Sequence, residues 1–194
     1  MLLSNKDVIG WLGSGMTVPA PQVIKFQYIS QFSTSESTWI ETGTYVGVTT
    51  EALARISKKV ISIEPSEALY RKSVERLRKF ENVELIYGTS EASFEAACSS
   101  VSGSVFFWLD GHYSGGDTFK GEQDCPVQSE LATISNFLFK YDQVHIFIDD
   151  FRLFRDTKMQ KSDYPLKSFL VQWAEKNGLE WSVSNDIFFA RTFA

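Results

Sequence analysis

The sequence predicts one α/β domain on a mostly parallel, seven-stranded β-sheet with a C-terminal antiparallel hairpin. Apolar runs rich in Val, Ile and Phe alternate with helical patterns, as strands and crossover helices do in a parallel sheet. Two strand-like runs then follow each other directly at the C-terminus. With 43% hydrophobic and 14% aromatic residues, 194 residues can bury one substantial core and leave little room for a second domain.

The strands are expected as short runs of β-branched and aromatic residues bounded by turn residues. Five parallel strands are predicted at residues 38–41, 60–63, 83–87, 105–109 and 144–148. Residues 179–183 and 187–193, separated by Ser184, Asn185 and Asp186, predict the closing hairpin.

Helices are predicted between the strands from apolar stripes at helical spacing. The first follows the N-cap candidate Ser66, the second follows Pro126, and the third follows Pro165 and ends at Asn177 and Gly178. The expected stripes are Tyr70, Val74 and Leu77; Val127, Leu131, Ile134 and Leu138; and Leu166, Phe169, Leu170 and Trp173. Residues 1–34 are expected to form a helical cap over the site, ahead of a main domain at 35–194.

Composition excludes several classes of function. The net charge of -5 and the pI near 5.1 argue against the basic surface that nucleic-acid binding needs. No apolar run reaches membrane-spanning length, and the N-terminus lacks the pattern of a signal peptide. Cys98 and Cys125 do not form a CxxC pair, so we expect reduced thiols and a cytoplasmic protein without nucleic-acid or membrane partners.

The first predicted strand runs into a glycine turn, Glu-Thr-Gly-Thr-Tyr-Val-Gly over residues 41–47, and a helical pattern follows. In a doubly wound sheet this loop lies where a nucleotide-like ligand binds. A dinucleotide fold would need a middle glycine, but residues 44–46 all carry β-carbons. S-adenosylmethionine has no phosphate and needs a glycine turn with a carboxylate near its ammonium, a role that Glu41 could fill. Alternatively, Gly43 and Gly47 only end a strand and begin a helix.

An acidic residue ends the second predicted strand, about 20 residues after Gly43. This residue, Glu64, could accept hydrogen bonds from both ribose hydroxyls, or it could be a surface residue in a turn before Pro65. Residues 88–90, Gly-Thr-Ser, end the third strand and would lie beside the adenine. Ser90 could instead be a helix N-cap.

Residues 41–49 resemble the Glu-Leu-Gly-Ala-Tyr-Cys-Gly-Tyr-Ser loop of class I S-adenosylmethionine-dependent methyltransferases of the metal-dependent O-methyltransferase type. That group includes catechol, caffeoyl-CoA and macrolide-sugar enzymes. Residues 63–64, 88–90, 105–110 and 147–150 match its other motifs, so the resemblance covers roughly residues 38–155. It implies a Rossmann-like methyltransferase fold and a cofactor site formed by Glu41, Gly43, Thr44, Tyr45, Gly47, Thr49, Glu64, Pro65, Gly88, Thr89, Ser90, Asp110 and His112.

The same resemblance implies a Mg²⁺ site at Asp110, Asp149 and Asp150, after the fourth and fifth strands. Magnesium prefers oxygen ligands and would lower the pKa of a bound hydroxyl. Alternatively, Asp110 touches only the cofactor, while Asp149 and Asp150 begin a loop. The sequence departs from the pattern because Asp replaces Asn at the third ligand, and because the lysine of the catechol type is missing after Asp110.

His112 stands after Asp110 and is the candidate general base, because an imidazole accepts a proton near neutral pH. It could also join a metal or be a plain loop histidine. Asp110 is the second catalytic candidate. The glycine-rich residues 111–121 are expected to form a substrate loop, and Glu130 and Arg152 are weaker candidates for substrate contact.

The leading hypothesis is methyl transfer to a hydroxyl of a small molecule or carbohydrate, with S-adenosylmethionine as cofactor and Mg²⁺ as an assisting ion. The glycine-rich loop resembles methyltransferase-like proteins of bacterial glycan pathways. Two alternatives stay open: a nucleotide-dependent oxidoreductase or epimerase, and a non-catalytic S-adenosylmethionine-binding protein. The state of assembly is also open, a homodimer included.

Overall fold

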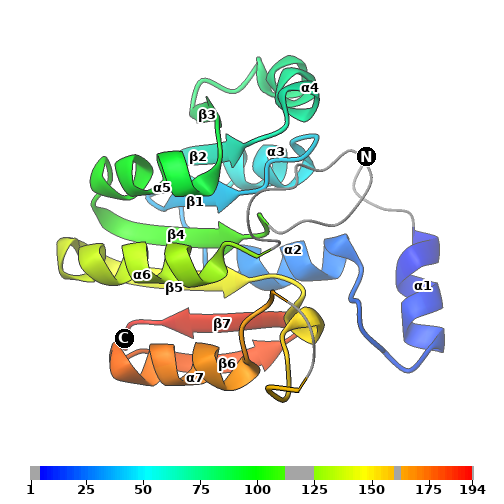
Figure 1. The fold of residues 1–194 in the computed structure, drawn as a ribbon. Coiled ribbons are helices and arrows are strands. Elements are labelled where there is room, and N and C mark those ends of the chain that lie inside the picture. Colours follow the sequence, from blue (N-terminus) through cyan, green and yellow to red (C-terminus); the bar gives the residue numbers. More distant parts are fainter. Residues whose placement is uncertain (1–4, 112–124, 160–162, 194) are drawn as a thin grey trace.

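A computed structural model of the chain describes residues 5–111, 125–159 and 163–193. Its seven-stranded sheet has the strand order β3-β2-β1-β4-β5-β7-β6 (Figure 1). The first five of these strands are parallel, and β7 pairs antiparallel with both β5 and β6. The predicted α/β fold with its C-terminal antiparallel hairpin is therefore confirmed.

Every predicted strand is present. The strands are β1 (Thr38–Thr42), β2 (Lys59–Glu64), β3 (Val83–Tyr87), β4 (Gly103–Leu109), β5 (Tyr141–Ile148), β6 (Glu180–Ser184) and β7 (Ile187–Arg191). The start of β5 was predicted three residues too late, because pairing with β4 continues through the exposed polar residues Asp142 and Gln143. The turn between β6 and β7 places Asn185 and Asp186 at positive φ, as a tight hairpin turn requires.

Helices cover both faces of the sheet. They are α1 (Asn5–Gly13), α2 (Gln22–Ser30), α3 (Val48–Ala54), α4 (Glu67–Leu77), α5 (Ser90–Ser99), α6 (Val127–Phe137) and α7 (Lys167–Lys176), with the short 3-10 helices η1 (Leu138–Lys140) and η2 (Phe151–Leu153). In Figure 1, α5, α6 and α7 lie in front of the sheet, and α2 and α3 lie behind it. Helices α1 and α2 fall within residues 1–34, while the division into a cap and a main domain stays a prediction.

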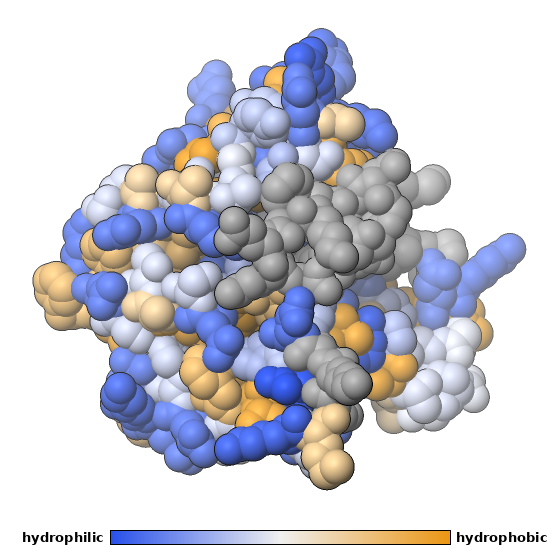
Figure 2. All heavy atoms as spheres, in the orientation of Figure 1, coloured by the Kyte–Doolittle hydropathy of each residue, from blue (hydrophilic) through white to orange (hydrophobic). Residues whose placement is uncertain are grey.

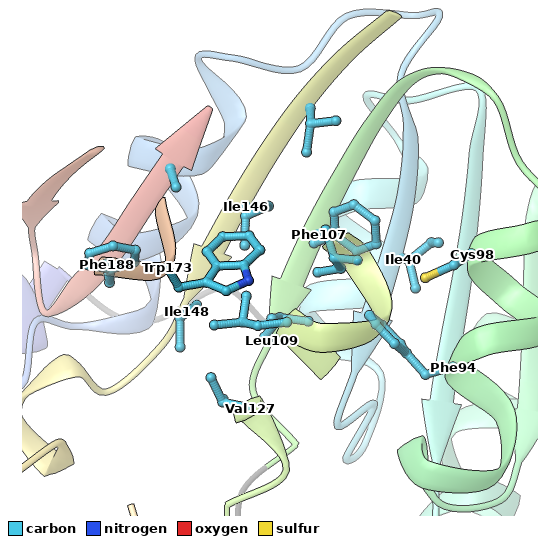
Figure 3. Packing of buried hydrophobic residues seen from close by; sticks show 14 of the residues in the cluster. Ile40, Phe94, Cys98, Phe107, Leu109, Val127, Ile146, Ile148, Trp173 and Phe188 are labelled. Atoms are coloured by element: carbon cyan, nitrogen blue, oxygen red, sulfur yellow. The ribbon is translucent and has the colours of Figure 1, made fainter. Parts of the chain in front are cut away.

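The two faces of the sheet bury different side chains. On the α5–α7 face, strand residues such as Phe107, Ile146 and Phe188 meet Phe94 of α5 and Trp173 of α7 (Figure 3). The α2–α3 face is more aromatic and is centred on Trp39, Phe106, Trp108, Phe147 and Phe189. A parallel sheet buried on both faces explains why its strands are continuous apolar runs rather than alternating ones.

Two details of the predicted helices are wrong. Ser66 is the N-cap of α4 as expected, but the buried residues are Leu69, Ser73 and Leu77, and Val74 is 42% exposed. Helix α4 packs at the sheet edge formed by β3, so the side of the helix that carries Val74 has no sheet surface to cover. Leu138 falls beyond the end of α6 and belongs to η1.

The exposed surface of the view in Figure 2 is mainly hydrophilic, and its hydrophobic residues lie in separate patches. None of the helices in residues 5–111, 125–159 and 163–193 combines the length and apolar character that a bilayer-spanning helix needs.

Candidate functional site

The candidate site lies where the strand order reverses, between β1 and β4. In open α/β sheets, ligands bind beyond the carboxyl ends of the strands at this switch point. The ends of β1, β4 and β5 lie at one edge of the sheet, and α2 reaches the same edge (Figure 1). Acidic side chains at or next to the strand ends are Glu41 on β1, Glu64 on β2, Asp110 after β4, and Asp149 and Asp150 after β5.

Gly43 is required by a close approach between neighbouring strand ends. Its φ is +85°, and a Cβ on this residue would lie 2.4 Å from the carbonyl oxygen of Asp110. The Asp110 N–H also donates to the Thr42 carbonyl over 3.1 Å, which holds the two strand ends together. Gly47 is the N-cap residue of α3 at φ +76°, and a Cβ there would meet Leu77 at 2.9 Å. Both glycines are therefore demanded by backbone geometry.

The N–H groups of the glycine loop donate mainly to acceptors within the chain. The pairs are Gly43 N to Ile63 O (3.0 Å), Thr44 N to Ile63 O (3.3 Å), Tyr45 N to Glu64 Oε2 (2.7 Å) and Gly47 N to Thr44 O (2.8 Å). Loops that bind phosphate direct their N–H groups at the anion instead. This loop is therefore not built as a phosphate cradle.

Glu64 is a buried carboxylate that fixes the loop. Oε2 accepts from the Tyr45 N–H, and Oε1 accepts from the Ser66 N–H over 2.8 Å. Burial raises the pKa of Glu64, and these two N–H groups oppose the shift. Each carboxylate oxygen has a second lone pair, so the side chain can still accept ribose hydroxyls. Its ribose role stays a prediction.

Glu41 is fully buried on the α2–α3 face, and its two carboxylate oxygens differ in their hydrogen bonding. Oε2 accepts from Thr50 Oγ1 at 2.5 Å and from Ser62 Oγ at 2.6 Å, while Oε1 has no hydrogen-bond partner among the described residues. Burial raises the pKa of Glu41 to about 7. Thr50 and Ser62 were not predicted as parts of the site.

A second unsatisfied polar group lies on the strand next to Glu41. Trp108 stands opposite Glu41 in the register of β1 and β4, so both side chains share one face of the sheet. The Trp108 Nε1 is buried, and in the described residues it too lacks a hydrogen-bond partner. An open acceptor and an open donor at the switch point suit a polar ligand, because burying such groups unpaired is costly.

The other residues of the predicted loop have mixed surroundings. Thr44 Oγ1 lies 2.5 Å from Ser62 Oγ in the buried network below the loop, and Tyr45 is 54% exposed. Thr49 accepts a hydrogen bond from Gln22 of α2 at 3.0 Å. Pro65 is partly buried next to Glu64. The structure thus brings these residues together around one loop, and their contact with a cofactor stays a prediction.

The predicted adenine loop lies against Glu64. The Gly88 N–H donates to the Glu64 carbonyl over 3.1 Å, which places residues 88–90 beside the end of β2. Thr89, rather than Ser90, is the N-cap residue of α5, so the N-cap alternative for Ser90 is wrong by one position. Ser90 is the first helical residue, and its hydroxyl lies next to the carboxylate of Glu130.

Glu130 of α6 is only 2% exposed, and neither carboxylate oxygen has a hydrogen-bond partner in the described part of the chain. Burial raises its pKa to about 7, and the nearby hydroxyls of Thr42 and Ser90 oppose the shift. Oε1 lies 3.6 Å from the position of a Cβ on Gly111, so the carboxyl group belongs to the switch-point edge. The sequence made Glu130 only a weak candidate for substrate contact, whereas the structure places its buried carboxyl group at the candidate site.

We predict that the Glu130→Gln variant is more stable than the wild type at pH 8. As the pH rises, the carboxyl group of the unfolded chain loses its proton near pH 4.5, whereas the folded protein keeps it up to a pKa of about 7. Its stabilising contribution is therefore complete below pH 4.5 and falls by up to about 3 kcal/mol as the pH rises through 7. Urea unfolding at pH 5 and pH 8 measures this slope, which Glu130→Gln should flatten. The exposed Glu175→Gln is the control, and a wild-type slope in Glu130→Gln would contradict the prediction.

A lysine from the N-terminal segment lies between the carboxylates after β5. Lys25 Nζ is 2.5 Å from Asp149 Oδ1 and 2.9 Å from Asp150 Oδ1. Burial lowers the pKa of Lys25, but the charges and hydrogen bonds of the two carboxylates outweigh this and leave it raised. The side chain is therefore a charged ammonium. No pattern in the sequence pointed to Lys25.

Asp150 is also linked to the C-terminal hairpin, through Arg152 of η2. Asp150 has φ +54°, and its Oδ1 accepts from Arg152 at 2.6 Å. Arg152 in turn pairs with the buried Asp186 of the hairpin turn, which also accepts from the Arg152 N–H at 2.8 Å. The strained backbone at Asp150 is thus fixed by a network that spans three segments of the chain.

Asp110 is partly buried at the end of β4. Burial raises its pKa well above the ordinary value; Asp149, Asp150 and Glu41 add to the rise, and Lys25 opposes it. A carboxylate with a raised pKa is a better proton acceptor. His112 and most of the predicted substrate loop lie outside the described residues.

The predicted Mg²⁺ ligands do not fit a magnesium site in this arrangement. The ammonium of Lys25 already lies against Asp149 and Asp150, and the Asp150 oxygen that faces it also binds Arg152. Magnesium needs several oxygen ligands in near-octahedral geometry around one point. Within the described ranges, no group of three or more His, Cys, Asp or Glu side chains is placed to hold a metal ion. The metal ligand set therefore stays a prediction that the contacts do not favour.

No protein-family model and no curated protein matches the sequence. Solved structures do match the fold, among them two methyltransferases and a fibrillarin. They are an rRNA methylase from Streptococcus thermophilus (17% identity, 90% of this chain and 96% of that one, TM-score 0.51), the precorrin-6y C5,15-methyltransferase from Geobacter metallireducens (9%, 90% and 89%, 0.56), and fibrillarin from Aeropyrum pernix with natively bound S-adenosyl-L-methionine (13%, 83% and 67%, 0.51).

At these levels of identity the likeness concerns the fold. The chain has the Rossmann-like methyltransferase fold, with a mostly parallel seven-stranded sheet and the antiparallel order β5-β7-β6 at one end. Fold alone does not fix an activity, because function depends on the site that a fold carries.

Proposed function

We propose that the chain is an S-adenosylmethionine-dependent methyltransferase that acts on a hydroxyl of a small molecule or sugar. The observation that carries the proposal is the 2.7 Å hydrogen bond from the Tyr45 N–H to Glu64. It joins the glycine bend to the strand-end carboxylate, so that one continuous surface can bind a ribose. Because the loop uses its N–H groups internally, it suits an adenosyl ligand without phosphates.

The charge balance of the site supports a cationic cofactor. Four acidic side chains, Glu41, Asp110, Asp149 and Asp150, interact electrostatically at the switch-point edge. Lys25 and Arg152 are the basic side chains that contact this group in the described residues. The surplus of carboxylates favours a ligand that carries an ammonium and a sulfonium group. The open Oε1 of Glu41 is the acceptor that we assign to the ammonium.

Topology disfavours the oxidoreductase or epimerase alternative. A dinucleotide-binding fold continues its parallel sheet with the sixth strand, whereas here the antiparallel β7 follows β5 in the sheet. Methyltransferases occur among the matching structures, and a matching fibrillarin carries natively bound S-adenosyl-L-methionine.

In the proposed reaction, the acceptor hydroxyl attacks the sulfonium methyl group in line, and catalysis comes from orientation and electrostatics. Asp110 is proposed to take the hydroxyl proton, since the pKa of its carboxyl is raised. His112 is the second candidate for that role. The proposed reaction includes no metal step, because Lys25 and Arg152 pair with the carboxylates that would bind the ion. The net charge of -5 disfavours a nucleic-acid acceptor.

Binding of S-adenosylhomocysteine, measured by calorimetry, tests the cofactor site. Glu64→Ala should weaken binding about tenfold, or about 1.4 kcal/mol, because a charged hydrogen-bond acceptor for the ribose is lost. The control is Glu67→Ala, which removes an exposed carboxylate paired with Arg71 on α4. Unchanged affinity in Glu64→Ala would remove Glu64 from the site, and a preference for NAD would overturn the proposed function. Tight binding without turnover on any hydroxylated acceptor would point to the non-catalytic alternative.

A further inference from the structure

Lys25 stands out because its buried charge joins distant parts of the chain. Only 4% of the residue is exposed, and it lies 125 residues from Asp150 in the sequence. Burying a lysine is costly unless the ammonium is paired. Here both partners are carboxylates at the functional edge of the sheet. The fold therefore brings a positive charge from α2, near the start of the chain, to this edge.

The placement of the ammonium is fixed by the face that α2 presents to the sheet. Gln22, Lys25 and Ile29 fall on one face of this helix, at spacings of three and four residues. Gln22 binds Thr49 of α3, and Ile29 is fully buried among the aromatic residues of the α2–α3 face. These two contacts lie on either side of Lys25 along the helix, so the ammonium is held at the carboxyl ends of the strands.

We propose that Lys25 supplies the fixed positive charge that a divalent cation supplies in metal-dependent enzymes, so that the acceptor end of this site works without a metal. A lysine ammonium has three N–H donors, and Asp149 and Asp150 are acceptors for two of them. The third can donate to an acceptor oxygen near Asp110. This last step rests on the proposed methyltransfer, whereas the replacement of the ion by the ammonium does not.

Titration with Mn²⁺, followed by electron paramagnetic resonance, tests the proposal on the full chain. Wild type should not bind Mn²⁺ at Asp149 and Asp150. Lys25→Ala removes the ammonium and should bind Mn²⁺ at least about tenfold more tightly, a difference of about 1.4 kcal/mol. The double variant Lys25→Ala/Asp149→Asn should lose this binding. Lys167→Ala, which removes a lysine paired with Asp156 at the surface, is the matched control and should behave like wild type.

Two outcomes would overturn the proposal. One is wild-type binding of Mn²⁺ that disappears in Asp149→Asn, which would mean that the ion displaces the lysine. The other is a folded Lys25→Ala without any gain in Mn²⁺ binding. If Lys25→Ala does not fold, the wild-type and Asp149→Asn titrations decide the question, with absence of binding in wild type as the supporting result.

Activity assays separate this inference from the proposed function. Wild-type turnover should be unchanged by excess chelator, while Lys25→Ala should lose tenfold or more in turnover and regain part of it with Mn²⁺. Its affinity for S-adenosylhomocysteine should stay close to wild type. A wild-type protein that binds no S-adenosylhomocysteine would refute the proposed function and leave the Mn²⁺ result to decide the role of Lys25.

Discussion

Asp110→Asn is expected to lower turnover by about a hundredfold or more, because loss of a general base has effects of this size. The amide keeps the shape of the side chain but cannot take a proton from the acceptor hydroxyl. Affinity for S-adenosylhomocysteine should fall far less than turnover, since the loop at Gly43 and the carboxylate of Glu64 are intact. Single-turnover kinetics and calorimetry on the same preparation measure the two quantities.

The pH profile provides a second measure of the role of Asp110. Burial and the neighbouring carboxylates raise its pKa, so the wild-type rate should fall as the pH drops through that raised value. The exposed Asp142→Asn on β5 is the control and should keep the wild-type rate and profile. Wild-type turnover in Asp110→Asn would assign proton transfer to another group, with His112 as the next residue to test.

Gly43→Ala should be the most destabilising single substitution in the glycine loop. An L-residue at positive φ costs about 1–2 kcal/mol, and overpacking adds about 1–3 kcal/mol. The new methyl group would lie 2.4 Å from the Asp110 carbonyl oxygen, and backbone on both sides resists movement. We expect a loss of about 3 kcal/mol in the free energy of unfolding by urea, together with at least tenfold weaker binding of S-adenosylhomocysteine.

Gly103→Ala is the matched control for this substitution. Gly103 has almost the same φ, +82°, but a Cβ there would have no atom within 4 Å. It should therefore lose only the 1–2 kcal/mol of backbone strain and keep the binding site intact. Equal losses in the two variants would show that the approach of Gly43 to Asp110 is not a tight contact.

Local patterns predicted much of the site as well as the fold. The two glycines, the strand-end Glu64, the aspartate after β4 and the acidic pair after β5 are all found at one edge, because parallel strands end on the same side of a sheet. The position of Ser62 in β2 was a further sign of a buried polar network. A polar residue inside the buried run of β2 needs a hydrogen-bond partner, and that partner is Glu41.

Other features had no local signal. The sequence around Glu130 is an ordinary amphipathic helix, and only the packing of α6 against the sheet shows that both carboxylate oxygens are buried without partners. The sequence also did not predict which side of α4 is exposed, because helical periodicity does not show where the sheet ends. Tyr70 instead packs against Tyr87 at that edge, with ring centroids 5.5 Å apart.

The sequence by itself determined which segments form strands, the closing hairpin and the glycine bend that leads into α3. These features follow from short-range sterics and from the burial of apolar runs, which act between residues close in the chain. Tertiary structure decided which charges meet. Lys25 faces Asp149 and Asp150 only because α2 packs across the aromatic face of the sheet, and Arg152 meets Asp186 only because the hairpin turn lies beside it. Such pairings depend on how distant elements pack, and no local pattern encodes that.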